Sequence, residues 1–410
     1  MRDDLTPALI KTGTVEFKRL CAAMVLAGFS TFSLLYGVQA LLPLLAVHFR
    51  VGAASASLAV SVATGTMAFT ILLASIVSDR VGRRIVMIGA LFGAAVFNVL
   101  AAGAPNWTSF LAMRLLCGLV LAGVPAVAMA YVGEEVEPAA IGPAMGVYIA
   151  GSAIGGLAGR VGVAAIADWF GWRAGVAVMG GVSLGAAALF ALYSPRSRAF
   201  VSRRHDIQMV LRETGALLRD QGQRLLYLEG FLLMGAFVTL YNYVGFRLSL
   251  PPYNLPPRAV GAIFLLYLLG SASSACTGRL AGRCGVRRVF WWPIALFLVG
   301  IGLTVFAQLW IVIVGLGVVT AGFFGAHTVA SSWVSRRAFD RRAQAGALYL
   351  SIYYVGSSLL GWLGGVAWVA AGWPGVALFA GGLCILALVV AFILARIPPL
   401  SDPRQPLPLP

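Results

Sequence analysis

Charged side chains are scarce in this chain of 410 residues. Asp, Glu, Lys and Arg together make up 11% of it, whereas a soluble domain carries about a quarter. Hydrophobic residues make up 60%, and the mean hydropathy is +0.91. This composition excludes an ordinary soluble globular protein and favours one that lies within a membrane.

Several elements of catalytic and metal sites are also missing. The chain has five cysteines, none of which pairs with another at metal-binding or redox spacing. It has no Gly-x-x-x-x-Gly-Lys loop, which disfavours an ATP-driven pump. We therefore expect reduced cysteines that serve packing, and neither a metal nor a cofactor.

Apolar runs of about twenty residues recur along the chain, and each is long enough to cross a hydrocarbon core as a helix. Barrel strands are excluded, because they are shorter and alternate in polarity. The first twenty residues are too polar for a cleaved signal peptide. The runs predict an all-α membrane protein with twelve spans, at about 20–48, 54–77, 85–103, 108–133, 139–167, 173–193, 223–250, 259–280, 289–307, 309–334, 345–370 and 374–396.

The positive charges predict the orientation of these spans. The net charge is +16, and most Lys and Arg residues fall in connections on one side of the predicted membrane. The other side holds only Arg50, Arg173, Arg247 and Arg258. By the positive-inside rule both termini and the central loop are cytoplasmic. The scatter of the charges over loops also disfavours nucleic-acid binding.

The chain repeats itself after about two hundred residues. The stretch Ser75–Arg84 (SIVSDRVGRR) has an echo at Gly278–Arg288 (GRLAGRCGVRR), in which Gly282 replaces the carboxylate and Arg287 aligns with Arg84. Phe170-Gly-Trp172 likewise falls opposite Ala371-Gly-Trp373. Such parallel repeats predict two six-helix bundles with a substrate path between them. We place the bundles at 1–193 and 223–396, a cytoplasmic loop at 194–222, and a disordered tail at 397–410.

These motifs resemble those of the major facilitator superfamily of secondary transporters, over nearly the whole chain. Its loop motif is matched by Asp79, Arg80, Gly82, Arg83 and Arg84, and its fourth-span motif by Arg114 and Gly118. Gly151, Gly155 and Gly159 resemble its antiporter motif, with Gly156 in place of the usual proline. Residues 241–247 and 326–333 resemble the bacterial acriflavin-sensitivity branch of drug and metabolite exporters.

The resemblance implies that the Asp79 loop is a cytoplasmic latch between the two bundles. Gly82 suits the tight turn, and Asp79 can accept hydrogen bonds from arginines or from a helix N-terminus. The alternative is a basic loop that only sets topology. The echo retains only the basic part of the motif, so the alternative is favoured there.

Four ionisable residues inside predicted spans are candidates for function, because charge is costly there and function is the default expectation. The resemblance assigns Arg114 to proton coupling or to bracing its bundle. For Arg160 the alternatives are snorkelling to the outer interface or pairing with Asp168. Glu229 and His327 are candidate proton carriers in the second bundle. Their alternatives are a Glu229–Arg224 pair and a hydrogen-bonded packing histidine.

Aromatic and polar residues at helical spacing are candidates for the lining of a substrate cavity. They are Phe32, Tyr36 and Gln39 in the first span, Thr239, Asn242 and Phe246 in the seventh, and Tyr349 and Tyr353 in the eleventh. The stripe of Gly151, Gly155 and Gly159 fits close helix packing better than ligand contact.

The sequence therefore predicts a proton-coupled exporter of a small drug-like or sugar-like compound. One alternative is a proton-coupled uptake symporter for a small metabolite, anionic if the intramembrane arginines bind it. A membrane-embedded enzyme or sensor is disfavoured by the duplication and by the lack of a catalytic dyad. We expect a monomer in the bacterial inner membrane, with a small-molecule substrate, protons and the lipid bilayer as its partners.

Overall fold

The computed structural model describes residues 9–197 and 207–398, and this part of the chain is built of helices. The predicted tail lies outside the described residues from 399 onward, as do residues 198–206 of the predicted central loop. The helices, with three short 3₁₀ turns, are α1 (Val15–Tyr36), η1 (Gly37–Leu41), α2 (Leu42–Phe49), α3 (Ala53–Val81), α4 (Arg83–Ala102), α5 (Trp107–Leu121), α6 (Pro125–Glu135), α7 (Pro138–Tyr193), α8 (Ile207–Arg219), α9 (Gln221–Ser249), α10 (Pro257–Ala262), η2 (Ile263–Leu266), α11 (Tyr267–Cys284), α12 (Val286–Val289), α13 (Trp291–Leu303), α14 (Leu309–Arg337), η3 (Phe339–Arg341) and α15 (Arg342–Arg396).

Within the described ranges, ten continuous helical segments are long and apolar enough to cross a membrane. Two of them, α7 and α15, have 56 and 55 residues, nearly three times the length that one crossing needs. Each is broken once by non-helical backbone, α7 at Gly171 and α15 at Ala371 and Gly372. Each therefore supplies two spans, so the predicted fold of twelve spans is confirmed.

The two breaks lie at positions that the sequence repeat places opposite each other. Gly171 has φ 80° and Gly372 has φ 59°, values that glycine adopts without the steric cost of a Cβ. The tryptophan that follows each glycine, Trp172 or Trp373, is buried. The repeat thus marks a real structural equivalence, in which a glycine and a tryptophan turn the chain back into the membrane.

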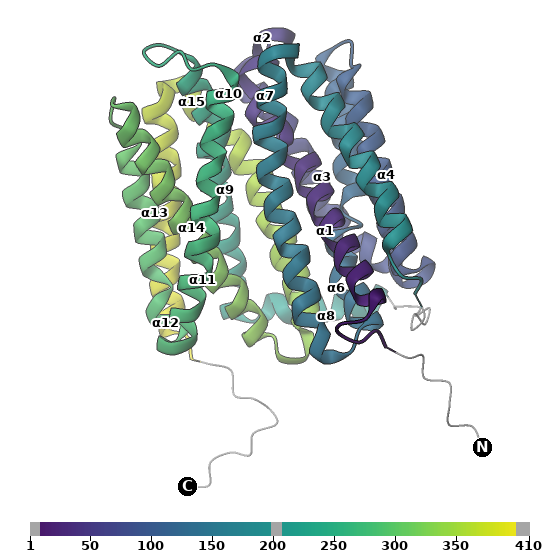
Figure 1. Cartoon of the computed structure of the whole chain (residues 1–410). Coiled ribbons are helices and arrows are strands. Elements are labelled where there is room, and N and C mark those ends of the chain that lie inside the picture. The colour runs from purple at the N-terminus through teal and green to yellow at the C-terminus, as the bar shows by residue number, and fades with distance from the viewer. Residues whose placement is uncertain (1–8, 198–206, 399–410) are drawn as a thin grey trace, which may run out of the picture. The chain divides into compact units, whose positions relative to one another are not determined.

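The chain forms two compact units. Unit 1 comprises residues 1–205, 239–265 and 357–376, and unit 2 comprises residues 206–238, 266–356 and 377–410. In unit 1, α1 packs along α7, and in unit 2, α14 packs against both α11 and α13 (Figure 1). Unit 1 thus takes in segments of α9 and α15 from the second sequence half. The predicted division into bundles at 1–193 and 223–396 stays a prediction.

The glycine stripe of α7 explains the close contact with α1. A Cβ on Gly151 would lie 2.4 Å from the carbonyl oxygen of Val25, and one on Gly155 would lie 2.1 Å from that of Phe29. Real side chains do not approach a backbone this closely, so no other residue fits without moving α1. The stripe therefore serves helix packing at both positions.

We expect Gly155→Ala to destabilise the protein by about 1–3 kcal/mol, the usual cost of overpacking a tight contact. The measurement is thermal unfolding of purified protein in detergent. Gly142→Ala, on the same helix, is the matched control, because a Cβ there meets nothing within 4 Å. Equal melting temperatures for the two variants would contradict the packing role of the stripe.

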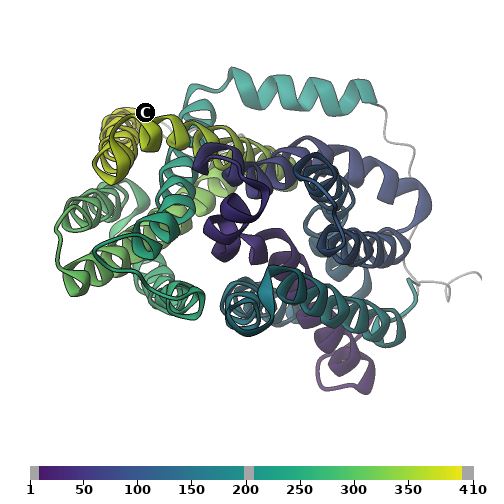
Figure 2. The same ribbon diagram turned by 90° about the horizontal axis from the view of Figure 1, so that it is seen from above.

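Helix α8 differs from the spanning helices. In Figure 2 it is seen lengthwise, whereas the spanning helices of unit 2 are seen close to end-on, so α8 runs crosswise to them. Its apolar residues include the buried Leu217, whereas Arg212 and Arg219 are exposed. An amphipathic helix of this kind suits the boundary between membrane and water.

Candidate functional site

The predicted latch forms a network of charges at the junction of α3 and α4. Gly82 joins the helices with φ 108°, which places Arg83 at the start of α4. The Arg83 guanidinium forms an ion pair with Asp79 and a second one, at 3.0 Å, with Glu134 at the end of α6. Asp79 and Arg83 are both buried. The carboxylate thus holds a buried guanidinium that also reaches a third helix.

Arg84, the last residue of the latch motif, makes a different contact. Its Nε donates to the carbonyl oxygen of Ser194 at 3.0 Å and to the Ser194 hydroxyl at 2.9 Å. Its Nη2 donates to the carbonyl of Ala191. These carbonyls end α7 and lack helical partners, so Arg84 caps that helix, and its charge suits the helix C-terminus.

The echo of the latch retains this cap but not the carboxylate. Arg287, which aligns with Arg84, donates from Nη2 to the carbonyl of Ile397, at the end of α15. At Gly282, the position aligned with Asp79, a Cβ would meet nothing within 4 Å. The echo therefore has a structural contact in unit 2 without the ion pair.

Arg114 is completely buried and is held largely by backbone carbonyls. Its Nε donates to Ala59 at 2.9 Å, and its two Nη atoms donate to Leu34 at 2.9 Å and Leu35 at 2.6 Å. Nη1 also lies 3.4 Å from Oδ1 of Asn98. The guanidinium thus ties α5 to α1, α3 and α4, which supports bracing as its role; proton coupling through Arg114 stays a prediction.

Three predicted residues meet inside unit 1, near the end of the spans that we predict to face outward. Gln39 Nε2 donates to Asn242 Oδ1 at 2.8 Å, and Arg160 Nε donates to Gln39 Oε1 at 2.8 Å. The Arg160 guanidinium also lies over the rings of Tyr36 and Phe264, 4.5 and 5.1 Å from their centroids. This polar cluster joins α9 to η1 and α7.

Arg160 is 3% exposed, so the interpretation that it snorkels to the outer interface is wrong. The second interpretation paired Arg160 with Asp168. Asp168 instead forms an ion pair with Arg258 at 3.2 Å. The sequence predicted Tyr36, Gln39 and Asn242 as cavity residues, but it gave no reason to group them with Arg160.

The other cavity candidates of unit 1 lie in separate contacts. Phe32 stacks on Tyr36 with ring centroids 6.3 Å apart. The Thr239 hydroxyl donates to the carbonyl of Leu360 at 3.0 Å, and Phe246 packs against Trp368 at 5.9 Å. Thr239 and Phe246 therefore take part in helix packing, and their role as cavity lining stays a prediction.

A second cluster lies within unit 2. His327 Nδ1 is 3.0 Å from the hydroxyl of Tyr349, and the His327 ring lies 4.9 Å from that of Tyr353. Glu229 lies close enough to Tyr349 for a charge there to act on its hydroxyl. The structure thus brings together both predicted proton carriers and the two cavity candidates of the eleventh span, Tyr349 and Tyr353.

Glu229 is the member of this cluster whose polar atoms lack hydrogen-bond partners within the described residues. It is 0% exposed, and neither carboxyl oxygen has a hydrogen-bond partner among the described residues. Its predicted pairing with Arg224 is therefore wrong. An ionised carboxylate in such a place costs several kcal/mol, which favours the neutral, protonated form.

Sequence reasoning missed two acidic residues that hold arginines. Glu134 was given no role from the sequence, yet it binds Arg83. Asp220 binds Arg337 through both oxygens, at 2.6 and 2.8 Å. The sequence could have indicated the Glu134 contact, because the loop that holds Glu134 and the loop that holds Arg83 lie on the same predicted side of the membrane, and acidic and basic side chains there can form ion pairs. The described residues contain no group of His, Cys, Asp and Glu that could hold a metal.

Comparison with known proteins identifies this arrangement of helices. The model of the Major Facilitator Superfamily matches residues 20–256 and 225–408. The chain belongs to this superfamily. It is a multi-pass membrane transporter rather than an enzyme.

Curated relatives match this chain over almost its whole length. The inner membrane transport protein YnfM of Escherichia coli (strain K12) is 41% identical over 392 residues, 94% of this chain and 93% of its own. The uncharacterized MFS-type transporter YybF of Bacillus subtilis (strain 168) is 37% identical and covers 97% of this chain and 98% of its own. The finer resemblance to the acriflavin-sensitivity branch stays a prediction.

Solved structures share the fold at lower identity. The nucleoside transporter NupG superposes with a TM-score of 0.76 at 15% identity, over 92% of this chain and 99% of its own. At this identity the likeness extends to the fold alone. It places this superfamily member among proteins with the same arrangement of helices.

Proposed function

We propose that this transporter is a proton-coupled antiporter that exports a small drug-like or sugar-like compound by alternating access. The observation that carries the proposal is the fully buried Glu229, whose carboxyl oxygens have no partner among the described residues. A coupling group must bind a proton in one state and release it in another. A dehydrated carboxyl holds its proton, and the same group exposed to water near neutral pH releases it.

His327 and Tyr349 extend this cluster. Their 3.0 Å contact links an imidazole to a hydroxyl within reach of Glu229. Tyrosine and histidine can both donate and accept hydrogen bonds, so the three groups form a polar site among aromatic rings. We propose that substrate competes with the proton here, with Tyr349 and Tyr353 offering stacking surfaces.

Alternating access also requires a contact that can open toward the outside. The Gln39–Asn242 bond and its support from Arg160 join helices of the two sequence halves near the predicted outer end. We propose that these contacts break when substrate is released outward. We propose that the Asp79–Arg83 ion pair, at the predicted cytoplasmic end, stays formed during outward release and breaks when the transporter opens to the cytoplasm.

The test of this function is reconstitution of the purified protein in liposomes with an imposed pH gradient and a panel of compounds. Antiport predicts that substrate moves opposite to the proton flow. Accumulation of substrate in the direction of proton flow would establish the symport alternative instead. Transport that ignores the gradient would refute proton coupling altogether.

Uptake of an anionic metabolite is the second candidate, and Arg160 favours it. This buried cation lies over two aromatic rings, a combination that suits an aromatic carboxylate. Arg160 already donates to Gln39 and to the carbonyl of Gly156, so a bound carboxylate would displace one of these partners. Arg114 is less suited to the role, because backbone carbonyls of two other helices hold its Nε and both Nη atoms. Loss of uptake of aromatic acids in Arg160→Gln, with neutral compounds unaffected, would favour this alternative.

We propose that the protein lies in the bacterial inner membrane as a monomer with both termini in the cytoplasm. The excess of Lys and Arg in the connections on one side supports this orientation.

A reporter fused after Arg204 is expected to lie in the cytoplasm, and one fused at Asn254 is expected to lie outside. The physical reason is that the connections predicted to be cytoplasmic hold most of the basic residues. The measurement is paired alkaline phosphatase and fluorescent protein activity in cells. Phosphatase activity after Arg204 would reverse the orientation and every assignment of inner and outer ends.

A further inference from the structure

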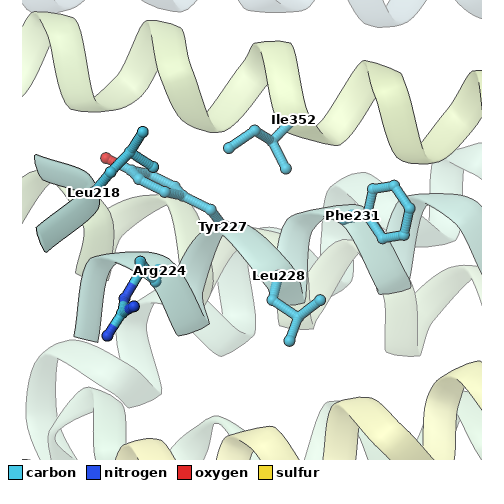
Figure 3. A pocket seen from close by; sticks show the side chains of 6 residues that line it. All are labelled: Leu218, Arg224, Tyr227, Leu228, Phe231 and Ile352. Carbon is cyan, nitrogen blue, oxygen red and sulfur yellow. The ribbon is translucent and has the colours of Figure 1, made fainter. Parts of the chain in front are cut away.

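An open pocket lies in unit 2, apart from the cluster of Glu229 and His327. It has a volume of about 330 Å³ and is lined by Leu218 of α8, four residues of α9 and Ile352 of α15 (Figure 3). Neither the family assignment nor the proposed transport cycle gives this pocket a role.

The α9 residues of the pocket are Arg224, Tyr227, Leu228 and Phe231. Their spacing of three, four and seven residues places them on one face of the helix. Seven residues span about 10 Å along a helix axis. The pocket is therefore elongated, with a charged end at Arg224, near the start of a spanning helix, and an apolar end at Phe231.

Arg224 provides an exposed positive charge, and its guanidinium has no hydrogen-bond partner among the described residues. The nearest carboxylate, Asp220, interacts with Arg224 through charge alone. The adjacent Asp220 is bound by Arg337 through both oxygens. Burial raises the pKa of the Asp220 carboxyl, but the hydrogen bonds from Arg337 and Gln223 and the charges of Arg337 and Arg224 outweigh this effect and keep the pKa below its usual range. That carboxylate is thus ionised and takes its hydrogen bonds from Arg337 and Gln223, so the guanidinium donors of Arg224 remain available to a further anion.

Tyr227 adds a buried polar group without a partner. Its side chain is 2% exposed, and its hydroxyl makes no hydrogen bond within the described part of the chain. Figure 3 shows this hydroxyl beside Leu218, at the same end of the pocket as Arg224. An unsatisfied buried hydroxyl costs about 1–3 kcal/mol, a cost that an acceptor from a ligand would remove.

We propose that the pocket binds one anionic phospholipid of the predicted cytoplasmic leaflet. The phosphate lies at Arg224 and Tyr227, and an acyl chain runs along Leu228, Phe231 and Ile352. Three features favour a lipid over a soluble anion. The charged end lies where a spanning helix begins, the remaining walls are apolar, and the amphipathic α8 suits the membrane surface. Anionic lipids also concentrate at basic cytoplasmic surfaces.

The experiment is native mass spectrometry of the full chain, released from nanodiscs that contain equal amounts of phosphatidylglycerol and phosphatidylcholine. We expect wild type to retain one phosphatidylglycerol, and Arg224→Gln to bind it about tenfold more weakly, since a charge-assisted hydrogen bond is lost. Tyr227→Phe should weaken binding by a smaller factor. Arg336→Gln removes another exposed arginine of the predicted cytoplasmic face and should leave retention unchanged.

Ile352→Trp tests the apolar end, because it fills the groove while Arg224 stays in place. It should reduce retention of phosphatidylglycerol without changing the melting temperature in phosphatidylcholine alone. Equal retention by wild type and Arg224→Gln would overturn the proposal. So would displacement of the lipid by millimolar inorganic phosphate, which would make the pocket a soluble-anion site, or by a transported compound, which would assign it to the substrate path. None of these results depends on the direction or coupling of transport.

Discussion

Glu229→Gln is expected to leave the protein folded and able to exchange substrate, while abolishing its coupling to the proton gradient. A glutamine side chain is neutral, as the protonated Glu229 carboxyl is. It therefore mimics the protonated form in the buried site, but it cannot release a proton. Substrate accumulation driven by a pH gradient should fall to the level seen without a gradient. Substrate exchange between equal concentrations should persist.

The measurement that separates these effects is substrate-induced proton release from detergent-solubilised protein. Wild type should release protons, and Glu229→Gln should release none. His327→Gln should give a smaller loss, since we regard Glu229 as the better candidate. Glu213→Gln, on α8 and outside the spans, is the control and should behave as wild type. If both single variants and the double variant release protons normally, coupling lies elsewhere or the protein is a uniporter.

Asp79→Asn is expected to retain folding and membrane insertion but to lower the transport rate by about tenfold or more. The buried Arg83 then loses Asp79, and of its charged partners among the described residues Glu134 remains. Removing one partner of a buried ion pair commonly costs about 3–5 kcal/mol, and only 1.4 kcal/mol in a barrier changes a rate tenfold. The latch state would therefore be strongly disfavoured in the cycle.

The measurement is transport by equal amounts of reconstituted protein, with expression and melting temperature determined in parallel. Gly282→Asp in the echo is the control, because the position is open and no ion pair is lost there. Glu134→Gln should reproduce part of the Asp79→Asn defect, since it removes the other partner of Arg83. Normal transport by Asp79→Asn would reduce the motif to a loop that sets topology.

The fold could be predicted because a helix that crosses a membrane needs a long apolar run, and such runs can be read directly from the sequence. Runs of about twenty apolar residues have one stable solution in lipid, the helix. The sequence also indicated where α7 and α15 turn sharply, because the repeat aligns Gly171 with Gly372. The length of each run, rather than any single contact, carried that information.

The site could be predicted only residue by residue. Glu229, His327 and Tyr349 were each singled out, but their meeting depends on how α9, α14 and α15 pack, which periodicity does not encode. The same limit explains the error at Glu229, where Arg224 lies five residues away and looked like a partner. On a helix, residues three and four apart are neighbours, whereas residues five apart are not.

The caps at Arg84 and Arg287 are the part of the repeated loop that both halves of the chain share. Both copies of the loop still hold the end of the last helix in their half, one at Ser194 and the other at Ile397. The first copy also has Asp79, the carboxylate on which the proposed latch depends, and the echo has a glycine in its place. The cap therefore supports a helix end in each half, whereas latching through this ion pair, as we propose it, acts through the first half alone. On this proposal the transporter is symmetric in the caps that hold its helix ends and asymmetric in the contact that opens and closes during transport.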